Sequence, residues 1–175
     1  MKRLSARLLL LPLLLVAGSA LAADAPATTA IPSPIPFDSV TTARYLATSR
    51  ALATAMATDD VKTFRALHTD AGWAQADDWW QGMLAAQKRK YGPVVRAYGP
   101  LRGTVRAGTM GVGIPPDAVA VLLILEKQMG AAMNITLDGE GKIVKSSLWV
   151  QGELAGADTQ GAGLLWEAPK KGAKP

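Results

Sequence analysis

The segment Ala118–Glu126 is apolar on both faces of the strand that it predicts. Side chains alternate along a strand, so successive residues point to opposite sides of the sheet. Val119, Val121, Leu123 and Leu125 form one set, and Ala120, Leu122 and Ile124 form the other. This pattern is typical of a central strand that is covered on both sides. The chain must therefore bury both faces of this strand.

Segments on either side of it complete an antiparallel sheet. Ala131–Leu137 alternates cleanly, and the tight-turn sequence Asp138-Gly139-Glu140-Gly141 joins it to Ile143–Gln151 as a hairpin. Upstream, Val94–Val105 predicts one or two irregular strands interrupted by Gly99-Pro100, and Gly108–Pro116 predicts a Gly/Pro loop. We expect a curved antiparallel sheet of about four strands.

Helical patterns come before the strands. Apolar residues recur at helical spacing over about residues 41–58, and a short second helix follows Asp59-Asp60. A third helix is expected from near Asp77 to about Tyr91, where Gly92-Pro93 stops it. This order predicts an α+β domain, in which three N-terminal helices pack on one face of the sheet.

The two ends of the chain have different compositions. Residues 1–22 combine basic, apolar and small residues in the order of a signal peptide cleaved after Ala22, and the apolar run is too short for a bilayer-spanning anchor. We expect export by the general secretory pathway to the periplasm or medium, with no transmembrane segment after cleavage. Residues 23–37 predict a Pro/Ala-rich linker, 38–153 the domain, and 154–175 a disordered Gly/Ala/Lys tail. Within that tail, Leu164-Leu165-Trp166 either docks on its own domain or binds a partner.

Charge and cysteine content exclude several functions. The net charge of +5 falls to +2 without residues 1–22, because Lys2, Arg3 and Arg7 leave with them. A nearly neutral body gives no electrostatic basis for binding nucleic acid. The chain has no cysteine and one histidine, so we predict neither disulfides nor a transition-metal site, and no cofactor.

A family resemblance covers about residues 38–151. It rests on the long first helix, the short helix with Asp60-Val61-Lys62-Thr63-Phe64, the Trp-bearing third helix ending in Tyr91-Gly92-Pro93, and the last two strands around Leu137–Ile143. These features resemble the nuclear-transport-factor-two-like, or cystatin-like, superfamily of cone-shaped α+β domains, above all its small secreted bacterial domains of unknown function. The resemblance implies a cone between helices and sheet. Members of the family include isomerases, cyclases, dehydratases and proteins without catalysis, so fold alone does not assign function.

No residue is predicted to be catalytic, because neither face of the central strands presents an acid or base inside the cone. Apolar and aromatic side chains are instead the expected lining of a ligand pocket. These candidates are Trp80, Met83, Leu84, Tyr91, Met133, Ile135 and Trp149.

Three other groups of residues have two interpretations each. His68 is either a general base oriented by Asp70 or a helix-end side chain with a local hydrogen bond, and we favour the second. Trp79 and Trp80 either pack in the core, which we favour, or form a carbohydrate surface beside Asp77-Asp78; exposure of Trp79 next to Trp73 would favour a sugar- or peptide-binding surface. A group of basic residues is either solvated, which we favour, or contacts an anionic envelope polymer or membrane headgroups. These residues are Lys88, Arg89, Lys90, Arg96, Arg102 and Arg106.

The sequence therefore favours an exported, non-catalytic binding or protein-interaction module over an enzyme. It would form a homodimer through the open face of its sheet or hold an apolar ligand in the cone. The alternative is a small isomerase, cyclase or hydratase that uses His68 or Asp70 as base. A further alternative is an accessory domain that docks on an exported enzyme through Leu164-Leu165-Trp166.

Overall fold

Helix α1 (Ser39–Thr58) begins after Asp38, whose Oδ1 accepts a hydrogen bond from the Thr41 amide at 2.6 Å. The structure is a computed structural model and describes residues 37–108, 110–159 and 162–170. The predicted signal peptide, all of the linker except Phe37, and residues 171–175 of the tail lie outside the described residues. Helix α2 (Val61–Ala66) begins in the same way, because Asp60 accepts from the Thr63 amide at 2.9 Å.

The next helical stretch begins earlier than predicted. It consists of α3 (Asp70–Trp79), a π-helical segment η1 (Trp80–Leu84) and α4 (Ala85–Tyr91). Asp77-Asp78 resembles a helix start in the sequence, but Thr69 is the residue whose Oγ1 accepts from the Gly72 amide, at 3.1 Å. A Cβ at Gly72 would collide with the Ile143 carbonyl. Gly72 therefore allows α3 to lie directly against the start of strand β6 (Ile143–Gln151).

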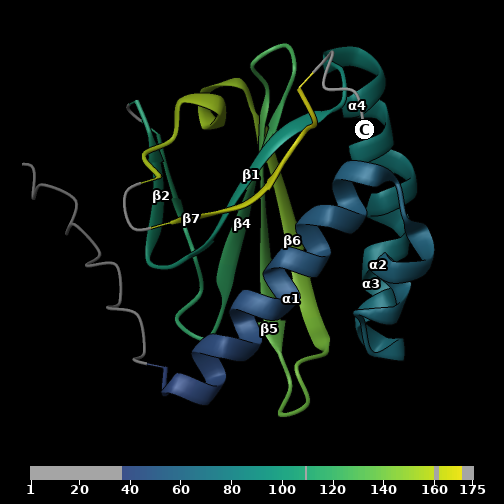
Figure 1. The fold of residues 1–175 in the computed structure, drawn as a ribbon, viewed down its shortest axis with the longest axis vertical. Coiled ribbons are helices and arrows are strands. Elements are labelled where there is room, and N and C mark those ends of the chain that lie inside the picture. Colours follow the sequence, from purple (N-terminus) through teal and green to yellow (C-terminus); the bar gives the residue numbers. More distant parts are fainter. Residues whose placement is uncertain (1–36, 109, 160–161, 171–175) are drawn as a thin grey trace, which may run out of the picture. The chain divides into compact units, whose positions relative to one another are not determined.

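Five antiparallel strands form the main sheet, in the order β6-β5-β4-β1-β7. Besides β6, these are β1 (Val94–Leu101), β4 (Val119–Leu125), β5 (Gly130–Leu137) and β7 (Gly163–Glu167). Figure 1 shows α1 crossing the sheet diagonally, with α2, α3 and α4 grouped beside β6. The fold is therefore α+β, with a mostly antiparallel sheet.

Strand β7 corrects the prediction of a disordered tail from residue 154. A short 3-10 helix, η2 (Gly152–Gly156), follows β6, and the chain then returns to pair β7 with β1. Leu165 on β7 is buried, and Glu167 pairs with Arg96 of β1 at 3.0 Å. The predicted tail has a Gly- and Ala-rich composition, but its one apolar patch gains enough from burial to order a strand.

A second, two-stranded sheet replaces part of the predicted Gly/Pro loop at 108–116. Strand β2 (Thr104–Ala107) pairs antiparallel with β3 (Met110–Gly113), so that Val105 lies opposite Val112. Both valines are buried. Gly111 and Gly113 made this segment look like a loop in the sequence, because glycine is depleted in strands.

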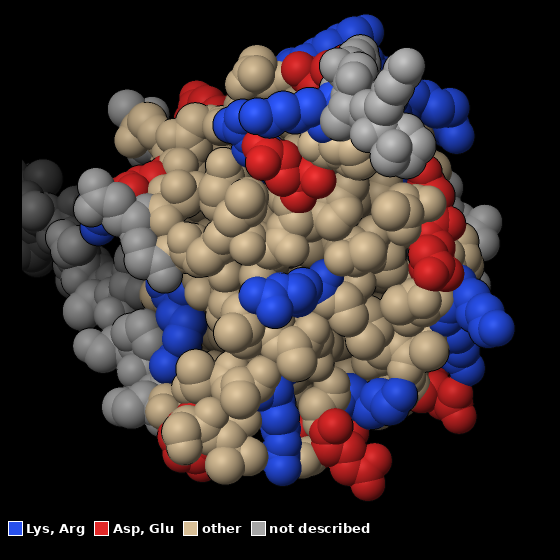
Figure 2. Space-filling view, in the orientation of Figure 1, with Lys and Arg blue, Asp and Glu red and all other residues tan. Residues whose placement is uncertain are grey.

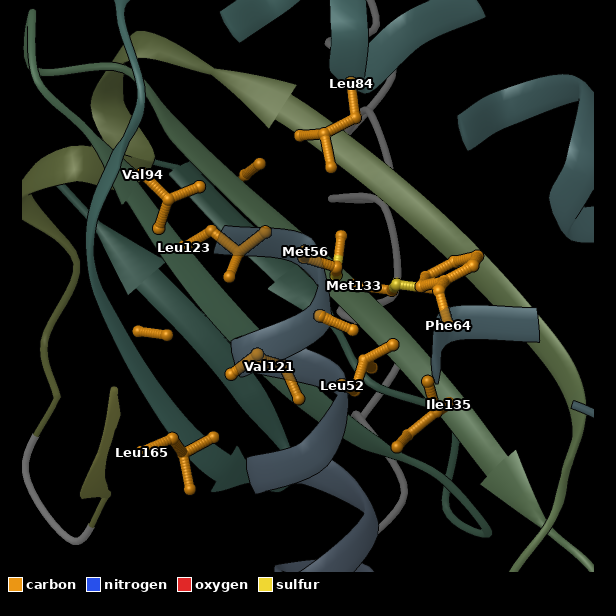
Figure 3. Close-up of a cluster of buried hydrophobic side chains, with 14 of the residues drawn as sticks. Leu52, Met56, Phe64, Leu84, Val94, Val121, Leu123, Met133, Ile135 and Leu165 are labelled. Carbon is orange, nitrogen blue, oxygen red and sulfur yellow. The ribbon is translucent and has the colours of Figure 1, made fainter. Parts of the chain in front are cut away.

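The main hydrophobic core lies between the helices and one face of the sheet. Figure 3 shows Leu52 and Met56 of α1 with Phe64 and Leu84, facing side chains from the strands. Val121, Leu123 and Leu125 supply the central strand's share of this core. Side chains from the helices and from all five strands of the main sheet fill the space between helices and sheet, where a cone was expected.

A second core covers the other face of β4. Ala120, Leu122 and Ile124 pack in a cluster with Val105 and Val112 of the β2–β3 hairpin and with Leu154 of η2, among others. The prediction that both faces of this strand must be buried is confirmed. The homodimer hypothesis was based on an open face of the sheet. Over β4 this face is not open, because the chain's own β2–β3 hairpin and the 3-10 helix η2 cover it.

Candidate functional site

His68 lies just after α2 and is buried, with 6% of its surface exposed. Its Nδ1 lies 2.8 Å from the Phe64 carbonyl oxygen. A carbonyl only accepts, so Nδ1 of the neutral ring carries the proton and Nε2 does not. Burial lowers the pKa of His68, the Phe64 hydrogen bond opposes this shift, and the Arg65 charge adds to it. His68 is therefore a neutral side chain held by its own helix.

Asp70 does not orient His68. Its Oδ1 pairs with Nη2 of Arg65 at 2.6 Å, and its side chain is 97% exposed. The imidazole packs instead against the rings of Phe64 and Trp73, with centroid distances of 4.7 and 6.0 Å. The structure thus does not bring together the histidine and carboxylate on which the enzyme alternative depended.

The seven predicted pocket residues also do not line one cavity. Leu84, Met133 and Ile135 are fully buried in the main core. Met83 and Trp149 are largely exposed, and Tyr91 lies at the margin of the core. The side chain of Trp80 lies outside the described residues, as do those of Trp79, Asp77 and Asp78. Leu84, Met133, Ile135 and other apolar side chains occupy the space between helices and sheet.

The basic residues between Lys88 and Arg106 do not form one cluster in the structure. Lys88 pairs with Asp59 at 2.6 Å, Arg96 pairs with Glu167, and the Arg102 guanidinium lies 3.7 Å from the centre of the Phe37 ring. Figure 2 shows basic and acidic side chains scattered over the face that carries α1 and β7, with uncharged surface between them. This arrangement gives no continuous basic surface on that face.

Two pockets lie elsewhere on the protein, with volumes of about 410 and 440 Å³. The larger of the two adjoins the main core. It lies between the beginning of α1 and the ends of β4 and β5, and we call it the mouth pocket. Such volumes fall within the range of small-molecule sites, about 300–1,000 Å³. Its lining residues are Phe37, Thr41, Arg44, Tyr45, Asp117, Thr136, Leu137, Asp138 and Gly139.

Tyr45 fixes the inner wall of the mouth pocket. Its hydroxyl donates to the Asp117 carbonyl at 2.7 Å and accepts from the Leu137 amide at 3.2 Å. One phenol thus connects α1 to the segment before β4 and to the end of β5. Burial raises the pKa of Tyr45, which keeps the hydroxyl protonated as this pair of bonds requires.

Aromatic stacking fixes a second wall. The Phe37 ring lies parallel to the Tyr45 ring, with a centroid distance of 4.7 Å and an interplanar angle of 6°. Arg102 covers Phe37 and also donates from Nη2 to the Pro116 carbonyl at 3.0 Å. The sequence placed Phe37 in the linker, whereas here it packs on α1.

The rim of the mouth pocket carries both signs of charge. Arg44 and Asp117 are exposed there, and the Oδ1 atom of Asp138 is engaged in its turn by the amides of Glu140 and Lys142, each at 2.9 Å. Across residues 37–108, 110–159 and 162–170, no group of three or more His, Asp or Glu side chains is arranged to hold a metal ion. The pocket therefore has an apolar and aromatic wall with a mixed polar rim, which is suited to binding.

Sequence reasoning missed this site because its residues come from three separate segments, 37–45, 117 and 136–139. Tyr45 was recognised only as part of a helical stripe. The available signal was Phe37, since an apolar residue just before a helix N-cap commonly packs back on that helix.

Comparisons with protein-family models, curated proteins and solved structures return no match to this chain. Within the described part of the chain, no helix combines the length and apolar character needed to cross a membrane.

Proposed function

We propose that this protein is an exported, non-catalytic binding module, which holds a small ligand with an apolar body in the mouth pocket. The observation that carries the proposal is the pocket's composition. Phe37, Tyr45 and Leu137 offer apolar surface that is continuous with the main core. Arg44 and Asp117 at the rim would contact the polar end of such a ligand.

Export and family membership belong to the same proposal. The signal-like residues 1–22 support a periplasmic or secreted location after cleavage at Ala22. An arrangement of three N-terminal helices on a curved sheet, of the nuclear-transport-factor-two-like type, is consistent with the order of helices before strands.

Catalysis by His68 has less support. A general base must lie within hydrogen-bond reach of the proton that it removes. The ring of His68 is buried against Phe64 and Trp73, and neither of the two larger pockets is lined by it. Asp70 faces solvent with Arg65 as its partner.

Filling the mouth pocket tests the proposal. The probe is 8-anilinonaphthalene-1-sulfonate, whose fused rings match the apolar wall and whose fluorescence rises in an apolar site. Thr41 lines the pocket, and Thr42, the next residue on α1, is exposed. We expect Thr41→Trp to weaken saturable probe binding at least about tenfold, or 1.4 kcal/mol.

Thr42→Trp is the matched control and should bind the probe like the parent protein. Circular dichroism of both variants checks that the fold is kept. Equal binding by the two variants, or no saturable binding by the parent protein, would contradict the proposed site.

A further inference from the structure

A second pocket, of about 410 Å³, lies on the opposite side of the sheet from the helices. We call it the β1 pocket. Its floor is apolar, and its rim carries the polar groups of Arg96, Tyr98, Gln128, Thr159 and Glu167. The apolar floor is formed by Val95, Ile124, Ala155, Ala157 and Ala168. None of these residues lines the mouth pocket.

A β-bulge brings Arg96 to this face. Val94 lies opposite Leu125 and Arg96 lies opposite Ile124, so β1 carries one extra residue, Val95, at this point. Bulges of this kind re-aim a side chain. Val95 and Arg96 consequently line the same pocket, although they are consecutive residues of one strand.

The pairing of β1 with its two neighbouring strands brings Arg96 next to Glu167. Arg96 has Ile124 of β4 as its neighbour on one side and Glu167 of β7 on the other. Nε of Arg96 and Oε1 of Glu167 are 3.0 Å apart. Glu167, followed by Tyr98, raises the pKa of Arg96. The pair holds a guanidinium and a carboxylate side by side, and because their side chains are 56% and 47% exposed, both can meet a further partner.

The opposite wall comes from two turns. Gln128 has a φ of 58°, which is uncommon for a residue other than glycine, in the turn between β4 and β5. The Leu125 carbonyl accepts from the Gln128 amide at 3.0 Å and holds this turn closed. Residues 155–159, which include the end of η2, supply Thr159 and two alanines. Strained backbone of this kind often accompanies a binding site.

These groups define a ligand class. The rim has donors and acceptors in nearly equal supply, and the Arg96 and Glu167 charges cancel, so an ionic ligand gains little. Hydroxyl groups both donate and accept, and the carbon skeleton of a sugar ring presents an apolar C–H face that fits an alanine- and isoleucine-lined floor. From this pairing we infer that the β1 pocket binds a neutral, hydroxyl-rich ligand of the size of a mono- or disaccharide.

Direct titration tests the inference. The protein expressed from the full chain is titrated with maltose, cellobiose and N,N′-diacetylchitobiose, and separately with sodium acetate and inorganic phosphate. Calorimetry gives the Kd, and saturation-transfer NMR identifies the sugar protons in contact. We expect at least one sugar to bind with a Kd of about 1 mM or tighter, and neither anion to compete with it.

Glu167→Gln should weaken this binding at least about tenfold, because the Arg96 charge is then uncompensated and the strongest acceptor is lost. Glu140→Gln makes the same change in the exposed turn before β6 and should leave the Kd unchanged. Tyr98→Phe, a milder variant, should raise the Kd severalfold even if Glu167→Gln fails to fold. The inference is overturned if no sugar binds, if acetate or phosphate displaces the sugar, or if the pocket variants bind as tightly as Glu140→Gln.

Discussion

At the scale of one residue, the buried side chain of His68 makes the stability of the fold depend on pH. The proton on Nδ1 of His68 is fixed by the Phe64 carbonyl, so a second proton would have to enter at Nε2. Nε2 is buried and has no hydrogen-bond partner among the described residues. Protonation would therefore place a charged N–H group in an aromatic environment beside Arg65. The unfolded chain has no such penalty.

The predicted result is a loss of stability in acid that depends on His68. Its pKa is lowered in the folded protein, so the unfolded state binds more protons below the ordinary histidine pKa of about 6.5. The contribution of neutral His68 is therefore fully present above about pH 6.5. It declines as the pH falls from there toward the folded-state pKa, by at most about 1.4 kcal/mol per pH unit.

Urea unfolding at several pH values checks this. The free energy of unfolding of His68→Gln should decrease less between pH 8 and pH 5 than that of the parent protein. Asp70→Asn, at an exposed position, serves as control and should follow the parent protein closely. If the free energy of unfolding of the parent protein and of His68→Gln changed equally with pH, protonation of His68 would not be coupled to unfolding.

At the scale of one element, strand β7 answers a question about the apolar patch that the sequence had left open. Leu164-Leu165-Trp166 was compatible with docking on the domain or with binding a partner. In the structure Leu165 is 7% exposed and belongs to the main core, whereas Leu164 is 51% exposed. The alternation of a strand separates the two neighbours. Pairing of β7 with β1 thus accounts for the docked half of the patch.

Alanine substitution at these two neighbours is a matched comparison. Leu165→Ala should reduce the free energy of unfolding by about 2–4 kcal/mol, because it removes buried methyl groups and leaves a cavity. Leu164→Ala should change it by less than about 0.5 kcal/mol. Chemical denaturation of both variants measures the difference. Equal small effects would mean that β7 contributes little to stability.

Sequence patterns predicted the elements with strong periodicity and missed those held by tertiary contacts. Strand β6 was predicted with its observed bounds, because a turn sequence and alternation marked it. Strands β2, β3 and β7 are short and glycine-flanked, and each depends on burial against a distant segment. The mouth pocket was missed for the same reason. Tyr45 and Leu137 are 92 positions apart in sequence, and only the folded chain brings them together.

At the scale of the whole molecule, one sheet separates two apolar cores. The central strand required both, but its sequence did not identify what would cover the second face. Because the β2–β3 hairpin and η2 provide that cover, the chain needs no second copy to bury Leu122 and Ile124. We therefore predict that the protein is a monomer.

Removing the hairpin should change the state of association. Replacement of residues 104–113 by a short Gly/Ser linker exposes Ala120 and Leu122, which are now fully buried. Apolar patches of this kind promote self-association. Sedimentation velocity should give a single monomer for the parent protein and concentration-dependent oligomers for the variant. A parent dimer, or a variant that stays monomeric with its helical signal intact, would contradict this prediction.

The position of β7 also governs when the sheet can be finished. It is the last strand among the described residues, yet its partner β1 lies far upstream, and the Arg96–Glu167 pair joins residues 71 positions apart. On the export route that we propose, the chain crosses the membrane unfolded, and the N-terminal part of the domain emerges before β7. One margin of β1 then stays open until the final segment has emerged. On that proposed route, the sheet would be completed only after translocation.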